Sequence, residues 1–327
     1  SLFQKAEDLF GSNDAITYYR QFVNLLANRI GTDNCWYAFV KLQEGRAYEK
    51  LYKIDSAIKC YEDAQAIFEK TVGKYNRWNN TCLEDLQHTY QLLGKSGQAL
   101  VYSKELLNNY LQMFGKHSVE YLYQLAVVAW QYSEAEQIEQ ACQKAEETLG
   151  LLNGMTVKLD ETTLYNIYDV LYVCFHELRQ YEKSLDILKK MEPIVRGEKI
   201  HASVLAYMAS TYCSLYDFRN ARIYCDQAYK ENVLSGDLFS YYYLWNIYFQ
   251  LNEKDTALKV LYEAKNKFRE YDQDIRNQVN VLSALGETFY SEGDYVSALK
   301  YYEDALSLAI KYNDKFDIKQ NFIIGSI

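Results

Sequence analysis

The chain has 327 residues but only one proline and 14 glycines, where average usage would give about 16 and 23. So few helix breakers argue for helix almost throughout, and an aromatic content of 16% excludes a disordered chain. The 35 basic and 44 acidic side chains give a net charge of −9 and are interleaved along the sequence, which disfavours a general nucleic-acid or anionic-membrane binder.

The cysteines and the N-terminus bear on the compartment. Seven cysteines, widely spaced and without a Cys-x-x-Cys pair, fit buried reduced thiols better than a disulfide framework. The sequence has no stretch of about 18 apolar residues, and residues 1–10 lack the basic and apolar regions of a signal peptide. We therefore expect a cytoplasmic protein with no membrane partner.

The first predicted element is a helix that includes residues 14–19, Asp-Ala-Ile-Thr-Tyr-Tyr. It matches the second helix of a helix-turn-helix unit that recurs further along the chain. Residues 1–37 are therefore expected to form a partial repeat whose first helix is missing or degenerate.

The next element shows the whole unit, and residues 284–305 repeat it. In both copies a glycine (Gly45 or Gly286) precedes an aromatic residue by three positions, an alanine by twelve, a tyrosine by sixteen and a second alanine by nineteen. One such pair of helices cannot bury its apolar stripe alone, so stability must come from stacking neighbouring pairs.

This spacing extends along the chain as two columns. The first-helix aromatics are Tyr48, Tyr90, Tyr132, Phe175, Tyr212, Tyr248 and Phe289. The small residues that open the second helices are Ala57, Ala99, Ala141, Ser184, Ala221, Ala257 and Ala298. Repeats are thus expected to begin near residues 38, 80, 122, 165, 202, 238 and 279, and residues 318–327 would open a further partial repeat.

The pattern of large and small residues resembles the tetratricopeptide repeat. From Ala15 onward the small residues lie 42, 42, 42, 43, 37, 36 and 41 positions apart, where the plain repeat takes about 34. This longer spacing is similar to the subtype typified by kinesin light chains. The resemblance implies an all-α, right-handed superhelix, an α-α solenoid of about seven full repeats with partial repeats at both ends. We expect residues 1–327 to form a single solenoid domain within a longer chain.

Glycine and proline mark the predicted helix ends. Gly73, Gly115 and Gly150 are expected to close second helices. Pro193 falls near the end of another second helix, where it should shorten or kink that helix, and the next spacing drops to 37 residues.

The sequence carries few of the residue groupings that catalysis requires. Gly94-Lys95-Ser96 resembles the end of a phosphate-binding loop, but Thr89 stands where that loop needs a glycine, so we interpret it as a turn between helices. The four histidines have no His-Glu-x-x-His spacing and no cysteine partner at a metal-ligand spacing. We expect no enzymatic activity, no metal and no cofactor.

In proteins with this repeat, ligands usually bind the concave face, which is lined by first-helix residues that packing does not use. By that register, the candidate peptide-binding residues are Phe39, Arg46, Glu84, His88, Tyr123, Trp130, Asn166, Asp169, Phe239, Tyr242, Asn246 and Glu287. This mildly acidic, aromatic set favours a protein or extended peptide with basic or aromatic residues, and no nucleic acid. The alternative for each ring is a place in the core, since a one-position error in register would turn it inward.

The sequence predicts a non-enzymatic protein- or peptide-binding scaffold that uses the concave groove. One alternative is a regulatory sensor that binds a small peptide or metabolite and controls an attached effector domain, as in the peptide-pheromone receptors of this fold. The other alternative is a structural spacer that self-associates.

Overall fold

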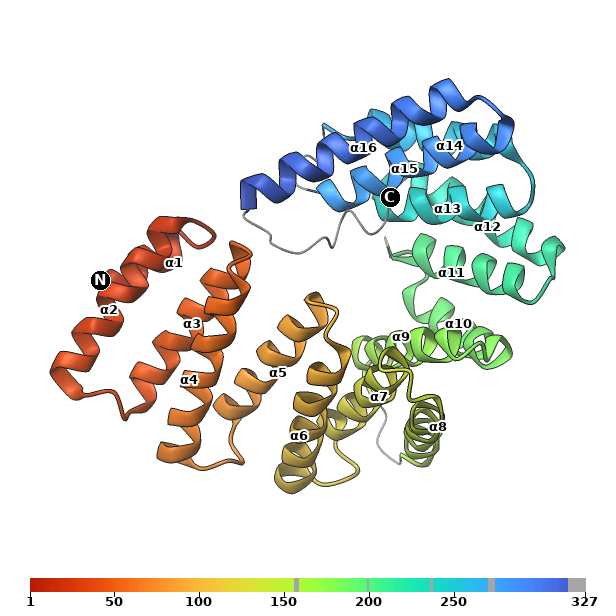
Figure 1. The fold of residues 1–327 in the computed structure, drawn as a ribbon. Helices are drawn as coiled ribbons and strands as arrows, with labels where there is room; N and C mark the ends of the chain where they lie inside the picture. The colour runs from red at the N-terminus through yellow and green to blue at the C-terminus, as the bar shows by residue number, and fades with distance from the viewer. Residues whose placement is uncertain (156–158, 199, 236–237, 270–273, 317–327) are drawn as a thin grey trace. The chain divides into compact units, whose positions relative to one another are not determined.

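A computed structural model describes residues 1–155, 159–198, 200–235, 238–269 and 274–316. Every secondary-structure element in these ranges is a helix (Figure 1). The chain divides into two compact units, Ser1–Lys158 and Leu159–Ile327, which we call unit 1 and unit 2. The expectation of a single domain therefore stays a prediction.

The described part of unit 1 contains eight helices. They are α1 (Leu2–Asp8), α2 (Asn13–Ile30), α3 (Cys35–Lys50), α4 (Ile54–Val72), α5 (Arg77–Leu92), α6 (Ser96–Phe114), α7 (Val119–Glu134) and α8 (Ile138–Gly154). Each odd-numbered helix packs on the next even-numbered one, and α2, α4 and α6 also pack on the first helix of the following pair. Only α1, with seven residues, is too short to make a full first helix.

The described part of unit 2 contains eight more helices in the same alternation. They are α9 (Glu161–Glu177), α10 (Tyr181–Val195), α11 (His201–Ser214), α12 (Phe218–Ser235), α13 (Leu238–Gln250), α14 (Lys254–Asn266), α15 (Ile275–Glu292) and α16 (Tyr295–Phe316). The pairs from α3/α4 to α15/α16 are the seven full repeats that the sequence predicts, which confirms the all-α fold.

The two predicted columns hold the helices of each pair together. All seven small residues at the start of the second helices are at most 2% exposed, so the helices approach closely there. Three of the first-helix aromatics stack on a ring twelve positions later. The stacked pairs are Tyr90–Tyr102, Tyr212–Tyr224 and Phe289–Tyr301, with ring centroids 5.5, 5.4 and 5.6 Å apart.

The turn after each first helix has one geometry in all seven pairs. The fifth residue after the aromatic donates its backbone N–H to the aromatic's carbonyl, as Lys53 does to Tyr48 at 2.9 Å. The fourth residue after the aromatic has a positive φ, yet it is a glycine in only two pairs. These residues are Tyr52, Gly94, Glu136, Arg179, Tyr216, Asn252 and Gly293. The turn is therefore a helix C-terminal motif that the chain forms even where the residue must adopt a left-handed backbone.

Gly45 and Gly286 are glycines because a ring lies against them. A Cβ on Gly45 would lie 2.6 Å from a ring carbon of Tyr61, and one on Gly286 would lie 2.7 Å from a ring carbon of Tyr302. In both cases the tyrosine is the residue sixteen positions later, as the sequence spacing predicts. The ring of a second helix thus packs directly on the backbone of its first helix.

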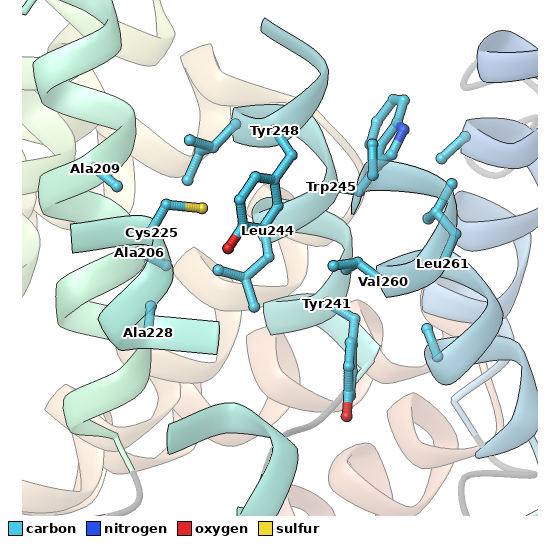
Figure 2. Close-up of a cluster of buried hydrophobic side chains, with 14 of the residues drawn as sticks. Ala206, Ala209, Cys225, Ala228, Tyr241, Leu244, Trp245, Tyr248, Val260 and Leu261 are labelled. Atoms are coloured by element: carbon cyan, nitrogen blue, oxygen red, sulfur yellow. The ribbon is translucent and has the colours of Figure 1, made fainter. Parts of the chain in front are cut away.

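The largest buried cluster of unit 2 centres on α13. Tyr241, Leu244, Trp245 and Tyr248 are each at most 2% exposed and pack with Val260 and Leu261 of α14 and with residues of α11 and α12 (Figure 2). Trp245 occupies the position that Gly45 holds in α3, so its indole cannot lie where the Tyr61 ring lies. It donates instead from Nε1 to the Thr288 hydroxyl of α15, at 2.8 Å.

The glycines and the proline that are expected to close or shorten second helices do not all do so. Gly73 and Gly115 end α4 and α6 with positive φ, whereas Gly150 lies inside α8, which continues to Gly154, so its predicted role as a helix end is wrong. Pro193 lies in the last turn of α10, which has 15 residues where α4 and α6 have 19. The predicted partial repeat at 318–327 lies outside the described residues.

His201 ties the shortened repeat after α10 to its neighbours. Its Nδ1 lies 2.8 Å from a carboxylate oxygen of Glu231 on α12, and its Nε2 lies 3.1 Å from one of Glu192 on α10. The His201 ring is only 8% exposed, so both contacts are largely shielded from water. This bridge fixes the first turn of α11 against both second helices.

Candidate functional site

The predicted binding residues lie on first helices, and the two units divide them equally. Unit 1 carries six of them, on α3, α5 and α7. Unit 2 carries the other six, on α9, α13 and α15, while α11 contributes small residues such as Ser203, Ala206 and Ser210 at the equivalent positions. We call these two sets the first-helix faces of unit 1 and unit 2.

On the face of unit 1, Arg46 is already paired. Its guanidinium donates two hydrogen bonds to the carboxylate of Asp85 on α5, at 2.7 and 3.2 Å. Burial favours neutral forms of both groups, but the pair raises the pKa of Arg46. A bidentate pair of this kind fixes the stagger between neighbouring first helices. Arg46 therefore links two repeats, and a ligand would have to compete with Asp85 for it.

His88 belongs to a second link between the same helices. Its Nδ1 lies 3.2 Å from Glu49, whose carboxylate also accepts hydrogen bonds from Thr89 at 2.8 Å and Tyr61 at 2.9 Å. The hydrogen bond to Glu49 raises the pKa of His88. Burial works to raise the pKa of Glu49, but the three hydrogen bonds outweigh it and lower that pKa. The ring of His88 remains more than half exposed.

Glu84 is exposed as a whole residue, but its carboxyl group points toward α6 and accepts a hydrogen bond from the hydroxyl of Tyr110. Burial of the carboxyl group raises the pKa of Glu84 in spite of this hydrogen bond. Its charge is thus shared with a second helix and is less available to a ligand than the sequence suggests.

The aromatic residues of unit 1 differ in how much they offer to a ligand. Phe39 is half-buried in a cluster of rings, with its centroid 5.3 Å from that of Trp78 and 6.0 Å from that of Phe3. Tyr123 on α7 is 41% exposed. Trp130, one turn beyond the middle of α7, is half-buried, and its indole N–H has no acceptor among the described residues.

On the face of unit 2, Asp169 stands apart from every other predicted acidic residue. Its carboxylate is half-buried on α9 and has no hydrogen bond or ion pair within the described ranges of the chain. Burial raises its pKa. It lies close enough to Tyr165 and Tyr172 to raise the pKa of each, although burial is the larger cause. A half-buried carboxylate without a partner is costly and favours a cation beside it.

A row of tyrosines lies beside Asp169. The ring of Tyr172 stacks on Tyr207 of α11 at 5.0 Å, and Tyr207 meets Tyr243 of α13 edge to face at 5.4 Å. His176, one turn along α9 from Tyr172, has its pKa lowered by burial and supplies no competing positive charge. The combination of a carboxylate with tyrosine rings is one that proteins use to bind ammonium and guanidinium groups.

The remaining predicted residues of unit 2 lie on α9, α13 and α15. Tyr242 is half-buried against Trp245 at 5.3 Å, and the side-chain carbonyl of Asn246 accepts a hydrogen bond from Gln250. Asn166 and Glu287 are exposed. The side chain of Phe239 lies outside the described residues.

Sequence reasoning missed the groups that complete these arrangements. Glu49 binds the predicted residue His88 of unit 1, and Tyr172, Tyr207 and Tyr243 form the row in unit 2. The sequence did contain a sign of the tyrosine row, because Tyr172 occupies the position that is glycine in α3 and α15. A large ring at that position cannot pack as the glycine does and must turn elsewhere.

The described residues contain neither a metal-binding cluster nor a helix suited to span a membrane. No group of three or more histidine, cysteine, aspartate or glutamate side chains there is placed to hold a metal ion. None of the helices in the same ranges has the length and apolar character needed to cross a membrane.

No protein-family model matches the sequence, and no curated protein matches it. Several solved structures, in contrast, are similar to this chain. The apo form of the quorum sensor NprR from B. thuringiensis is similar over 94% of this chain and 86% of its own, with a TM-score of 0.62 and 14% identity. A Rap protein complexed with Competence and Sporulation Factor is similar over 95% of this chain and 91% of its own, with a TM-score of 0.56 and 15% identity.

A third similar structure contains nearly identical TPR-like repeats of a kinesin light chain from Podosopora anserina. It is similar over 59% of this chain and 92% of its own, with a TM-score of 0.51 and 16% identity. At such identities the likeness concerns the fold. The chain therefore has a tetratricopeptide-like repeat fold, and the resemblance seen in the sequence is confirmed.

Proposed function

We propose that this chain is a non-enzymatic binding scaffold, and that the first-helix face of unit 2 binds an extended peptide or protein segment carrying a lysine or arginine. The observation that carries the proposal is the carboxylate of Asp169, half-buried and without a partner among the described residues. The face of unit 1 offers less, because Arg46 and His88 are each paired with a neighbouring repeat.

The surroundings of Asp169 suit a basic side chain in two ways. Tyr207, which stacks on the buried Tyr172, presents ring surface to the methylene stem and the cation. Asn246 on α13 can hydrogen-bond the backbone of an extended segment once it releases Gln250. The ligand's positive charge would stabilise the ionised form of Asp169, so binding should strengthen as pH rises through the raised pKa of that carboxyl group.

Fluorescence anisotropy with three labelled nonapeptide pools tests the proposal. The pools share random neutral residues and differ at the central position, which is lysine, norleucine or glutamate. Norleucine keeps the apolar stem without the charge. We expect the lysine pool to bind at least about tenfold more tightly than the norleucine pool, a difference of about 1.4 kcal/mol.

Asp169→Asn should remove this preference while keeping the shape of the side chain. Asp186→Asn, an exposed position on the second helix α10, makes the same chemical change away from the face and should leave the preference intact. Equal binding of the lysine and norleucine pools, or equal loss in both variants, would contradict the proposal.

A regulatory sensor is the second candidate. Two of the similar structures are a quorum sensor and a Rap protein in complex with Competence and Sporulation Factor, which supports comparing the two hypotheses. A sensor must change conformation when its ligand binds. Small-angle scattering with and without a saturating lysine pool separates the two, since a scaffold keeps one scattering profile and a sensor does not.

A further inference from the structure

Unit 1 has a pocket that the proposed function does not use. It has a volume of about 530 Å³ and lies between α2 and α4, over one side of α3. Tyr37, Lys41, Glu44 and Tyr48 contribute its α3 wall at a spacing of three to four residues. At about 100° per residue these positions lie on the side of α3 opposite Phe39 and the other first-helix-face positions.

Within this wall, one repeat departs from the other six. Lys41 and Glu44 precede the aromatic Tyr48 by seven and four positions. The equivalent pairs in the other repeats are Leu83/Leu86, Leu125/Val128, Tyr168/Leu171, Leu205/Met208, Tyr241/Leu244 and Leu282/Leu285. All but Tyr168 are buried. The fold of the repeat thus needs an apolar pair here, and the charged pair occurs where the pocket lies.

Stability alone does not account for these charges. The side chain of Glu44 is 5% exposed and that of Lys41 is 15% exposed, with Nζ 3.1 Å from a Glu44 oxygen. Taking both charges out of water costs about as much as their attraction returns, and an apolar pair of similar volume is often as stabilising or more so. The nearly buried Glu44 also has Arg20 Nε at 3.6 Å, so it holds two cations at the pocket.

The pocket is locally basic in a chain of net charge −9. Its lining has three cations, Arg20, Lys41 and Lys59, against one acid, Glu44, and a second acid, Asp63, lies outside the lining with its carboxylate 4.0 Å from Lys41 Nζ. Burial works to lower the pKa of Lys41, but Cys60 and Glu44 outweigh it and raise that pKa to about 12, so the ammonium group stays charged. The ammonium group of Lys59 has no partner among the described residues, and the Arg20 guanidinium is 65% exposed.

We propose that this pocket binds a small molecule in which a carboxylate or phosphate group is attached to a compact apolar or aromatic body. The anionic group is held by Lys41, Arg20 and Lys59, and Glu44 positions the first two of them. Tyr37 and Tyr48 flank the body of the ligand. The volume lies within the range of about 300–1,000 Å³ that small-molecule sites occupy. This site is separate from the first-helix faces and does not depend on the proposed peptide-binding function.

Isothermal titration calorimetry of the whole chain at low salt tests the proposal with five probes. They are inorganic phosphate, benzoate, phenyl phosphate, the neutral benzamide and an acidic hexaglutamate peptide. We expect benzoate or phenyl phosphate to bind at least tenfold more tightly than benzamide and than inorganic phosphate. Failure of both ring-bearing anions to exceed benzamide would overturn the proposal. So would hexaglutamate as the only ligand, which would indicate an acidic protein partner.

Two variants assign the binding to the pocket. Lys41→Leu combined with Glu44→Leu installs the apolar pair of the other repeats, so it should fold with a thermal midpoint no lower than the parent and bind the preferred anion at least tenfold more weakly. Lys95→Met removes a cation from an exposed position at the start of α6 and should change the affinity less than twofold. Undiminished binding by the double variant, or an equal loss with Lys95→Met, would overturn the assignment.

Discussion

Replacing Gly45 with alanine should destabilise the protein, although the same change in a free helix stabilises it. An added methyl group would have its carbon 2.6 and 2.8 Å from two ring carbons of Tyr61 and 3.1 Å from Cβ of Cys60. Ordinary carbon contacts are about 3.5–4.0 Å, so the ring or the helix must move by about 1 Å. Tyr61 is fully buried and its hydroxyl is bonded to Glu49 at 2.9 Å, so it has little room to yield.

The magnitude follows from two opposing effects. Overpacking a filled core costs about 1–3 kcal/mol, and exchanging glycine for alanine inside a helix returns about 1 kcal/mol. We expect a net loss of up to about 2 kcal/mol in the free energy of unfolding. Gly286→Ala should cost less, because Tyr302 is only partly buried and its ring can tilt outward.

Urea unfolding followed by circular dichroism measures the difference. Gly150→Ala is the matched control, since Gly150 lies inside α8, is exposed, and has nothing within 4 Å of an added Cβ. It should gain up to about 1 kcal/mol. In a Tyr61→Ala background, the cost of Gly45→Ala should disappear. If Gly45→Ala stabilises the chain as Gly150→Ala does, the close approach of α3 and α4 is wrong.

Three other changes follow from the packing and the turns. Glu136→Gly should raise the free energy of unfolding by up to about 1 kcal/mol, because Glu136 has a positive φ of 58° after α7 and its side chain is exposed. A variant that shows no gain in stability on urea unfolding would contradict the turn geometry. Ala257→Leu should cost about 1–3 kcal/mol, since Ala257 is fully buried at the α13/α14 contact, and a variant that melts like the parent would refute the register. The hydrogen bond to Glu49 raises the pKa of His88 in the folded state. The stability that this bond adds to the folded state is therefore complete below about pH 6.5 and is lost as pH rises through the folded-state pKa. His88→Gln should therefore lower the thermal midpoint more at about pH 5.5 than at about pH 9, with at most about 0.5 kcal/mol at stake for so exposed a ring, and a pH-independent difference would count against the Glu49 link.

The fold could be predicted from the sequence because its determinants are local and repeated. The spacing from Gly45 to Tyr61 encodes a ring packed on a helix backbone, and the structure places that ring where the spacing requires. The same reasoning predicted that the first helix before Ala15 is missing or degenerate, and α1, with seven residues, is a short first helix. Gly150 misled because a glycine in an exposed helix interior costs only about 1 kcal/mol and does not by itself end a helix.

The candidate site was less predictable because its chemistry depends on neighbouring repeats. The sequence places Arg46 and Asp169 at equivalent kinds of position, one on α3 and one on α9, and gives no reason to treat them differently. The tertiary structure pairs Arg46 with Asp85 and leaves Asp169 without a partner among the described residues. Whether a charged side chain finds a partner depends on the stagger between helices about 40 residues apart in sequence, as between Arg46 and Asp85. A hydrogen bond forms or fails within about 1 Å of that stagger.

The sequence by itself determined the class of helix, the number of pairs and the residues at which the helices of a pair touch, because each is a short-range periodic property. The sequence also contains the charged pair Lys41 and Glu44 at two first-helix positions that are apolar or tyrosine in the other six repeats. Only the tertiary structure showed that this departure adjoins a pocket of about 530 Å³ and that Arg20 of α2 joins it. Burial and electrostatic pairing are properties of the packed helices, and they depend on the distances between side chains that the linear order leaves open.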